Sequence, residues 1–243
     1  MPTLGLLRVL PPWMGRRPLP AKVSLRERSH HAGSDNEPSE QSAAAVRLYW
    51  IPLGAGLDVV RLTVARLSGN VFEAVSALAR QRPPCDLYHA ALEVSLPGRR
   101  FVIEMTGAPD RHGCKRGVVC QGAMSAPWLG RFRLFRYEVR CWPGGTIPDA
   151  KYAADSPVLV STDIGKARRL PEAAAAIPVP VWGRDQLRTG EMWNSNSVVS
   201  WLLERSGIGT EHVRPPRRGR APGWATGVVA AALRPVQEPG KRR

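Results

Sequence analysis

The stretch from Glu191 to Ile208 constrains the fold more than any other part of the sequence. Four small polar residues, 194–197, lead directly into apolar residues at helical spacing, namely Val198, Val199, Leu202 and Leu203. Asn and Ser begin helices, because their side-chain oxygens accept hydrogen bonds from the N–H groups of the first turn. Gly207 is typical of the position just past a helix end. We therefore predict a buried helix over 195–206 that opens at Asn194 or Ser195.

The start of this predicted helix carries a hydroxyl at the positive end of the helix dipole. A Ser in that position is suited to be a nucleophile, and it is equally suited to be a simple helix cap. Both interpretations of Ser195 stay open at this point.

Upstream of this helix, period-two alternation of apolar and polar residues predicts strands. They cover 46–51, 59–64, 88–94, 99–105, 118–120 and 132–141. Predicted helices cover 70–80 and 163–176, a short helical turn covers 183–187, and 228–233 is a strand or a short helix. Strands come first and helices follow, which favours the α+β class, with a small antiparallel sheet packed against helices.

The ordered pattern occupies the middle of the 243-residue chain. Residues 1–45 are rich in Pro and polar residues without periodicity, so we expect a disordered N-terminal extension. Residues 46–234 are expected to form one α+β domain, and residues 235–243 a disordered basic tail.

The formal net charge of +15 is spread unevenly, and residues 209–243 hold eight Lys or Arg against two Asp or Glu. Such charge favours weak, non-specific binding to anionic surfaces. The sequence has no apolar run of the roughly 20 residues that a membrane span needs, and it has no signal-peptide core. Its four cysteines form no CxxC pair, which is typical of a reducing compartment. We therefore expect a cytoplasmic protein.

Three residues have the types and order of a hydrolytic site. His89 lies within one predicted strand, Glu104 lies on the next strand beyond a tight turn, and Ser195 begins the helix. Neighbouring antiparallel strands can place a His and a carboxylate side by side. A His held by a carboxylate is poised as a general base, and a nucleophile at a helix start would complete the arrangement.

The segments around these residues, Tyr88-His-Ala-Ala-Leu-Glu93, Phe101-Val-Ile-Glu104 and Asn194-Ser-Asn-Ser-Val198, resemble the permuted papain-like hydrolases of the NlpC and lecithin retinol acyltransferase type. The resemblance covers about 46–208. It implies a permuted papain-like fold and a hydrolase or acyl-transfer enzyme acting on an amide or ester. His89 would be the general base, Glu104 its orienting residue and Ser195 the nucleophile, with Asn194 and Asn196 supplying an oxyanion site. The substrate would be a small molecule or a peptide, and no cofactor or metal is implied.

The chain departs from that family at the nucleophile, because the family uses Cys where this chain has Ser195. A thiol ionises readily at a helix start beside a His, whereas a hydroxyl needs base catalysis during attack. An alternative is therefore a non-catalytic binding relative that lost the Cys nucleophile.

Three further possibilities remain open. Cys85, four residues before His89, could be the nucleophile in place of Ser195, but it lies in a loop with nothing to lower its pKa. His112, Cys114, Cys120 and Cys141 could bind zinc, although their spacing is looser than zinc sites show. The basic segments 131–136, 214–220 and 241–243 would suit a nucleic-acid-binding protein, although no known binding module is present.

Overall fold

The computed structural model of this chain describes residues 43–53, 85–107, 117–147 and 149–233. The predicted strand 59–64 and the predicted helix 70–80 lie outside these residues, as do the disordered tail predicted for 235–243 and residues 1–42 of the disordered extension predicted for 1–45. The end of that extension was predicted wrongly, because Ala44 and Ala45 are buried and β1 begins at Ala45.

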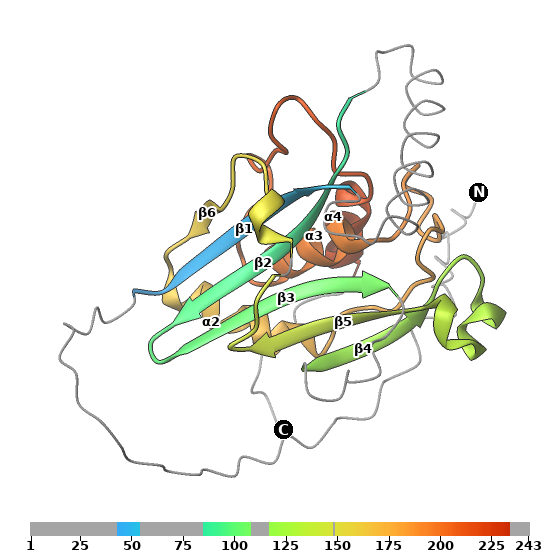
Figure 1. The fold of residues 1–243 in the computed structure, drawn as a ribbon, viewed down its shortest axis with the longest axis horizontal. Coiled ribbons are helices and arrows are strands. Elements are labelled where there is room, and N and C mark those ends of the chain that lie inside the picture. Colours follow the sequence, from blue (N-terminus) through green and yellow to red (C-terminus); the bar gives the residue numbers. More distant parts are fainter. Residues whose placement is uncertain (1–42, 54–84, 108–116, 148, 234–243) are drawn as a thin grey trace, which may run out of the picture.

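The described residues form a six-stranded sheet in the order β4-β5-β3-β2-β1-β6 (Figure 1). The strands are β1 (Ala45–Pro52), β2 (Tyr88–Leu96), β3 (Arg99–Gly107), β4 (Val118–Ala123), β5 (Arg136–Pro143) and β6 (Val158–Ser161). Every neighbouring pair is antiparallel. Together with the helices this confirms the predicted α+β class.

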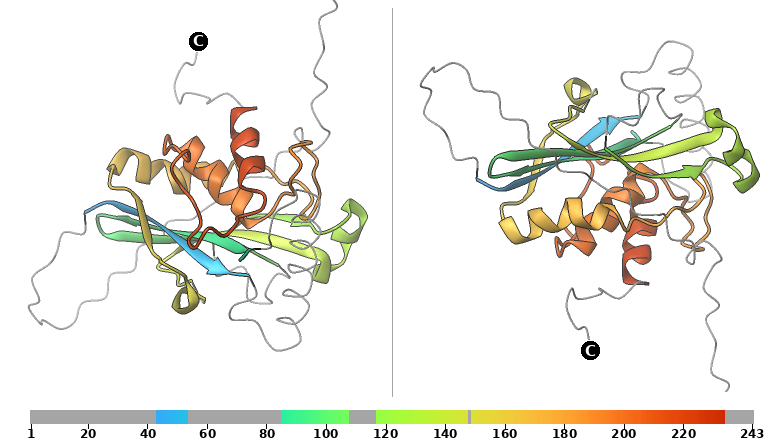
Figure 2. Two further views of the ribbon diagram at one scale, coloured as in Figure 1. Left: turned by 90° about the horizontal axis from the view of Figure 1, so that it is seen from above. Right: turned by 90° about the horizontal axis from the view of Figure 1, so that it is seen from below.

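Three helices cover one face of the sheet, as both views of Figure 2 show. They are α2 (Ile164–Ala174), α3 (Ser195–Arg205) and α4 (Trp224–Ala232). The short 3-10 helices are η3 (Pro127–Arg131), η4 (Arg133–Phe135) and η5 (Ala150–Tyr152), and η5 lies on the opposite face of the sheet.

The main core lies between the sheet and the three helices. Alternate residues of the central strands contribute to it, such as Leu48, Leu92 and Ile103, all completely buried. Helix α3 contributes nine buried residues of its eleven, so it is the central helix of the layer. A smaller apolar cluster of Ile51, Ala91, Val102 and Ile147 lies on the other face of the sheet.

Helices α3 and α4 pack at very close range. A Cβ added to Gly227 of α4 would lie 2.1 Å from both the Ser197 carbonyl oxygen and the Ser200 hydroxyl of α3. A glycine with no side chain is what permits this approach.

Most predicted elements are found close to their expected positions. The strands at 88–94 and 99–105 form the β2–β3 hairpin, and Asp163 caps α2 by accepting a hydrogen bond from Lys166 N at 2.8 Å. The segment 228–233, left open between strand and helix, belongs to α4.

Three predictions of local structure were wrong. Residues 132–135 do not extend β5, because Phe132 N and Phe135 N bind the carbonyls of Leu129 and Phe132 in tight turns. Residues 183–187 form no helical turn. Strand β6 was missed, since its four residues are too few to show a periodicity.

Candidate functional site

The polar run at the start of α3 caps the helix as the sequence predicted. The Asn194 side chain accepts hydrogen bonds from Asn196 N at 2.9 Å and Ser197 N at 3.3 Å. Ser197 Oγ in turn accepts from Asn194 N at 3.1 Å, which completes a capping box.

Asn194 and Ser197, together with Ser200 one turn further along α3, also bind the backbone of segment 222–224, which leads into α4. Asn194 Nδ2 donates to the Pro222 carbonyl at 2.7 Å, Ser197 Oγ to the Gly223 carbonyl at 2.7 Å, and Ser200 Oγ to the Trp224 carbonyl at 2.8 Å. We call these contacts the helix-start latch. They join two segments more than twenty residues apart in the chain.

Glu191 completes the latch from just before α3. Its Oε2 accepts a hydrogen bond from Gly223 N at 2.8 Å, and its Oε1 lies 3.2 Å from Arg220 Nη2. Gly223 has a φ of +87°, and a Cβ there would lie 2.6 Å from Asn194 Oδ1. The latch therefore requires glycine at this turn.

Asn196 connects the latch to the sheet. Its Nδ2 donates to the carbonyls of Tyr88 and Pro222, both at 2.9 Å. Both amide hydrogens of Asn196 are thus used within the fold. The oxyanion role predicted for Asn194 and Asn196 gains no support from this geometry, because their side chains bind backbone instead of facing an open site.

Ser195 differs from its neighbours. Its residue is 7% exposed, and among the described residues its hydroxyl makes no hydrogen bond. Ser195 is the first residue of α3, where the helix dipole is positive.

His89 and Glu104 lie on the face of the sheet away from the helices. His89 pairs across the strands with Ile51, which belongs to the cluster on that face. The neighbouring residues Tyr88 and Ala90 point into the core beneath the helices. Glu104 alternates in the same way with Ile103 and Met105 of the main core. The sheet therefore brings His89 and Glu104 to one face, and it separates both from Ser195 on the helical face.

Glu104 pairs with an arginine. Arg140 Nη1 lies 3.2 Å from Glu104 Oε1, and Arg140 Nη2 lies 2.5 Å from Glu138 Oε1. The three groups form a buried charge cluster on β3 and β5, in which Glu138 is completely buried. Among the described residues, Glu138 Oε2 has no hydrogen-bond partner. Glu104 is thus part of an ion-pair cluster, and burial lowers the pKa of His89 to about 4, so that this imidazole is neutral at pH 7.

Two of the described cysteines, Cys120 and Cys141, lie in strands and are largely buried. Burial raises the pKa of Cys120 and of Cys141 to about 12, so both stay as thiols. No group of three metal-ligating side chains occurs in the part of the chain that the structure describes. His112 and Cys114 of the predicted zinc site lie outside it.

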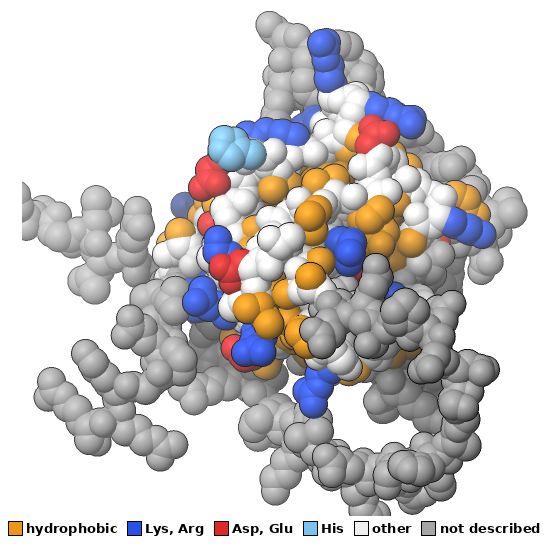
Figure 3. Space-filling view, turned by 90° about the vertical axis from the view of Figure 1, so that its left-hand side faces the viewer, with side chains coloured by type: hydrophobic (Ala, Val, Ile, Leu, Met, Phe, Trp, Pro, Cys, Tyr) orange, Lys and Arg blue, Asp and Glu red, His pale blue; other side chains and the backbone are white. Residues whose placement is uncertain are grey.

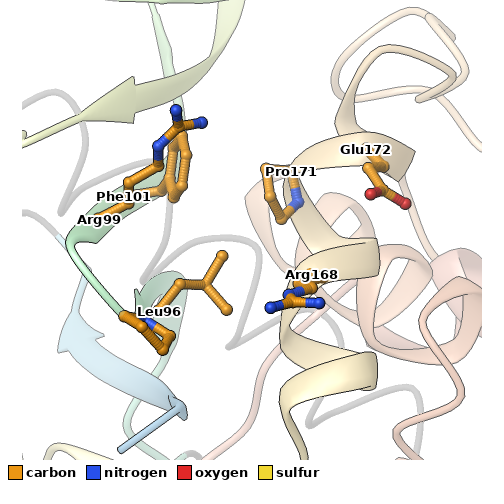
Figure 4. A pocket seen from close by; sticks show the side chains of 7 residues that line it. Leu96, Arg99, Phe101, Arg168, Pro171 and Glu172 are labelled. Carbon is orange, nitrogen blue, oxygen red and sulfur yellow. The ribbon is translucent and has the colours of Figure 1, made fainter. Parts of the chain in front are cut away.

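An open cleft of about 500 Å³ lies between the β2–β3 hairpin and α2 (Figure 4). Leu96 and Phe101 line its hairpin side, while Arg168, Pro171 and Glu172 line its helical side. Leu96 and Tyr88 are the two ends of β2, so the cleft lies far from the start of α3. None of the predicted site residues lines it.

The predicted basic segments differ in how many of their side chains make contacts within the protein. In segment 214–220, Arg220 pairs with Glu191 and Arg214 Nη1 donates to the Val213 carbonyl at 2.9 Å. Segment 241–243 lies outside the described residues. On the side of the molecule shown in Figure 3, Lys and Arg side chains are scattered among apolar and neutral ones and form no continuous basic patch. Segment 131–136 lies elsewhere, at the end of the molecule where η3 and η4 project beyond the sheet (Figure 1).

Comparisons of the chain with known protein families, with curated proteins and with solved structures find no match. The resemblance to papain-like hydrolases therefore stays a prediction. None of the helices in the described ranges is both long and apolar enough to span a membrane.

Two features of this region were not predicted from the sequence. The latch contacts of Glu191 depend on a turn 32 residues away, and no local pattern signals them. The charge cluster could have been predicted, because Glu138 and Arg140 alternate with the apolar residues of β5. Buried strands rarely carry two charges unless these charges are paired.

Proposed function

We propose that this protein acts by binding and not by catalysis, as a non-catalytic relative of the permuted papain-like hydrolases. The position of His89 is the observation that carries the proposal. A general base must come within hydrogen-bond reach of the nucleophile, and His89 lies on the face of the sheet away from Ser195.

The helix-start latch supports the same proposal. In a hydrolase, donors at the start of α3 would face the reacting oxygen of a substrate. Here Asn194, Asn196 and Ser197 donate to the backbone of the fold. The Asn-Ser-Asn-Ser run thus stabilises the packing of α3 and α4, and it can be explained without chemistry.

Relationship to the hydrolase family is supported by the chain order. Strand β2 with His89, strand β3 with Glu104 and then α3 with Ser195 follow the order that the resemblance implies. Asn196 holds the helix start beside Tyr88, the residue just before His89.

Hydrolysis remains the second candidate, because one observation favours it. Within the polar run 194–197, the Ser195 hydroxyl makes no hydrogen bond among the described residues, and it lies at the positive end of α3. An active site there would need a general base other than His89.

A screen with broad ester and amide substrates tests the proposal. Wild type, Ser195→Ala and Ser195→Cys are compared at equal concentration. We expect turnover at the background rate from all three, because the Ser195 hydroxyl makes no hydrogen bond to a base among the described residues and His89 lies on the other face of the sheet. Turnover that is present in the wild type and lost in Ser195→Ala would overturn the proposal and support the hydrolase.

A further inference from the structure

The loop that joins β4 to β5 carries an exposed apolar surface. Trp128 is 60% exposed, Phe132 50% and Leu134 67%. Together with Pro127, Arg131, Arg133 and Phe135 they form what we call the apolar tip, residues 127–135, which projects beyond the end of the sheet (Figures 1 and 2). Large apolar side chains gathered at such exposure mark an interaction surface.

Hydrogen bonds hold the backbone of the tip in place, so its side chains project from a fixed support. Met124 N donates to the Phe135 carbonyl at 2.9 Å and closes the base of the loop. The Arg136 guanidinium crosses the loop, with Nε donating to the Gly130 carbonyl at 2.5 Å and Nη2 to the Arg131 carbonyl at 3.3 Å. A rigid tip loses little conformational entropy when it binds.

The charge of the tip indicates its partner. The segment 121–137 has three arginines and no Asp or Glu. Arg184 adds a cation at the base, where its Nε donates to the Ser125 carbonyl at 2.5 Å. Aromatic and aliphatic side chains surrounded by cations match the interface of a bilayer with anionic lipids, where rings and Leu enter the headgroup boundary and Arg binds phosphate.

The packing of the rings favours lipid over nucleic acid. Arg131 lies 5.4 Å from the Trp128 ring centroid and 5.0 Å from that of Phe132. A guanidinium therefore already covers a face of each ring, where a base would otherwise stack. Leu134, the most exposed of the three, has no role in base stacking but gains from burial in hydrocarbon.

We propose that the apolar tip docks the protein on anionic membrane surfaces, with Trp128, Phe132 and Leu134 entering the interface and the arginines binding lipid phosphates. This inference rests on the proposed binding function and names its partner. Its test is independent of the substrate screen, so that either proposal can fail alone.

Co-sedimentation of the full chain with vesicles tests the docking. Vesicles of phosphatidylcholine alone are compared with vesicles that also contain phosphatidylglycerol. We expect binding to the anionic vesicles only, and a roughly 100-fold or greater loss in the variant Trp128→Ser/Phe132→Ser/Leu134→Ser, because three inserted side chains are removed. Arg131→Ala should lower the partition coefficient roughly fivefold, and added salt should do the same progressively.

Leu159→Ser is the matched control, because Leu159 of β6 is 57% exposed and lies outside the tip. It should bind as the wild type does. All substituted residues are exposed, so circular dichroism should show equal melting temperatures for every variant. Binding by the triple variant equal to that of the wild type would overturn the proposal, since the basic tails would then account for it. Failure to bind anionic vesicles would also overturn it, whether or not a single-stranded oligonucleotide binds in parallel.

Discussion

Arg140 is a single residue that pairs with two carboxylates. Its guanidinium contacts Glu104 and Glu138, and the side chains of all three are almost inaccessible to water. A buried ion pair adds little net stability compared with apolar residues, but removal of one partner leaves buried charge without compensation.

We therefore expect Arg140→Leu to lower the free energy of unfolding by roughly 3 kcal/mol or more. Arg47→Leu is the control, because the Arg47–Glu93 pair is 3.5 Å apart and its arginine side chain is 38% exposed. Its cost should stay below about 1 kcal/mol. Urea denaturation at pH 7 measures both, and similar losses for the two variants would contradict the assignment of a buried charge cluster.

His89 makes the stability of the fold depend on pH in the acid range. Burial lowers its pKa from 6.5 to about 4 in the folded state. Between these values the unfolded chain binds a proton that the folded chain does not, so stability is lost as the pH falls from about 7 to 4.

The variant His89→Gln keeps a polar side chain but cannot titrate. We expect the wild type to lose about 1 to 3 kcal/mol more than His89→Gln over this pH range, since each pKa unit corresponds to about 1.4 kcal/mol. Urea denaturation at several pH values provides the comparison. Parallel curves for the two proteins would show that the imidazole is not held neutral by the fold.

At the scale of elements, α3 depends on what its first turn binds. Ser197 is completely buried and its hydroxyl takes part in both the capping box and the latch. Ser195, two residues earlier, makes no such contact among the described residues. The two serines form a natural matched pair.

Ser197→Ala should lower the free energy of unfolding by about 1 to 2 kcal/mol, because it leaves the Asn194 N–H without its partner and removes one of the two hydrogen bonds to the Gly223 carbonyl. Ser195→Ala should change it by less than about 0.5 kcal/mol. Chemical denaturation of both variants checks the difference. The reverse order would mean that Ser195, and not Ser197, fixes the helix start.

The element that differs most from expectation is the segment before β5. Period-two alternation runs through 132–141, yet the strand begins only at Arg136. Alternation indicates which residues could share a face of a strand. It does not predict that the Arg136 guanidinium binds the carbonyls of the preceding loop. Those contacts close the tip and expose Phe132 and Leu134.

For the whole molecule, the chain after Gly219 holds the two layers together. Tyr88 N binds the Arg220 carbonyl at 2.9 Å, the latch binds 222–224, and the Trp224 ring lies 5.2 Å from that of Trp50 on β1. A late segment thus contacts the first described strand, the second strand and the central helix.

A chain that ends at Gly219 should therefore lose its cooperative thermal unfolding transition, because Tyr88, the latch and Trp50 lose their partners together. A chain that ends at Leu233 keeps every one of these contacts and should retain the transition. Calorimetry of the two truncated proteins measures this. A cooperative transition in the shorter chain would show that the remaining sheet and helices form a stable unit without α4.

The α+β class, the β2–β3 hairpin and the capped helix at 195 could be predicted because their signals are local. Alternation, a turn and a cap each involve residues a few positions apart. The face on which His89 lies could not be predicted in the same way. Alternation groups His89 with Ala91, but only the packing of α3 and α4, over one hundred residues later, decides which group meets the helices. The same limit applies to Ser195, whose neighbours bind a turn that no local pattern links to it.

The close contact at Gly227 has a consequence for how relatives of this protein are to be recognised. An alanine there would collide with the backbone of α3, so sequences that diverge from this one while keeping its fold are constrained to glycine at this position and to a small residue at Ser200. His89 lies on the other face of the sheet and takes no part in this contact between helices. A search for distant homologues guided by Gly227, Gly223 and the Asn-Ser-Asn-Ser run should therefore reach further than one guided by the histidine.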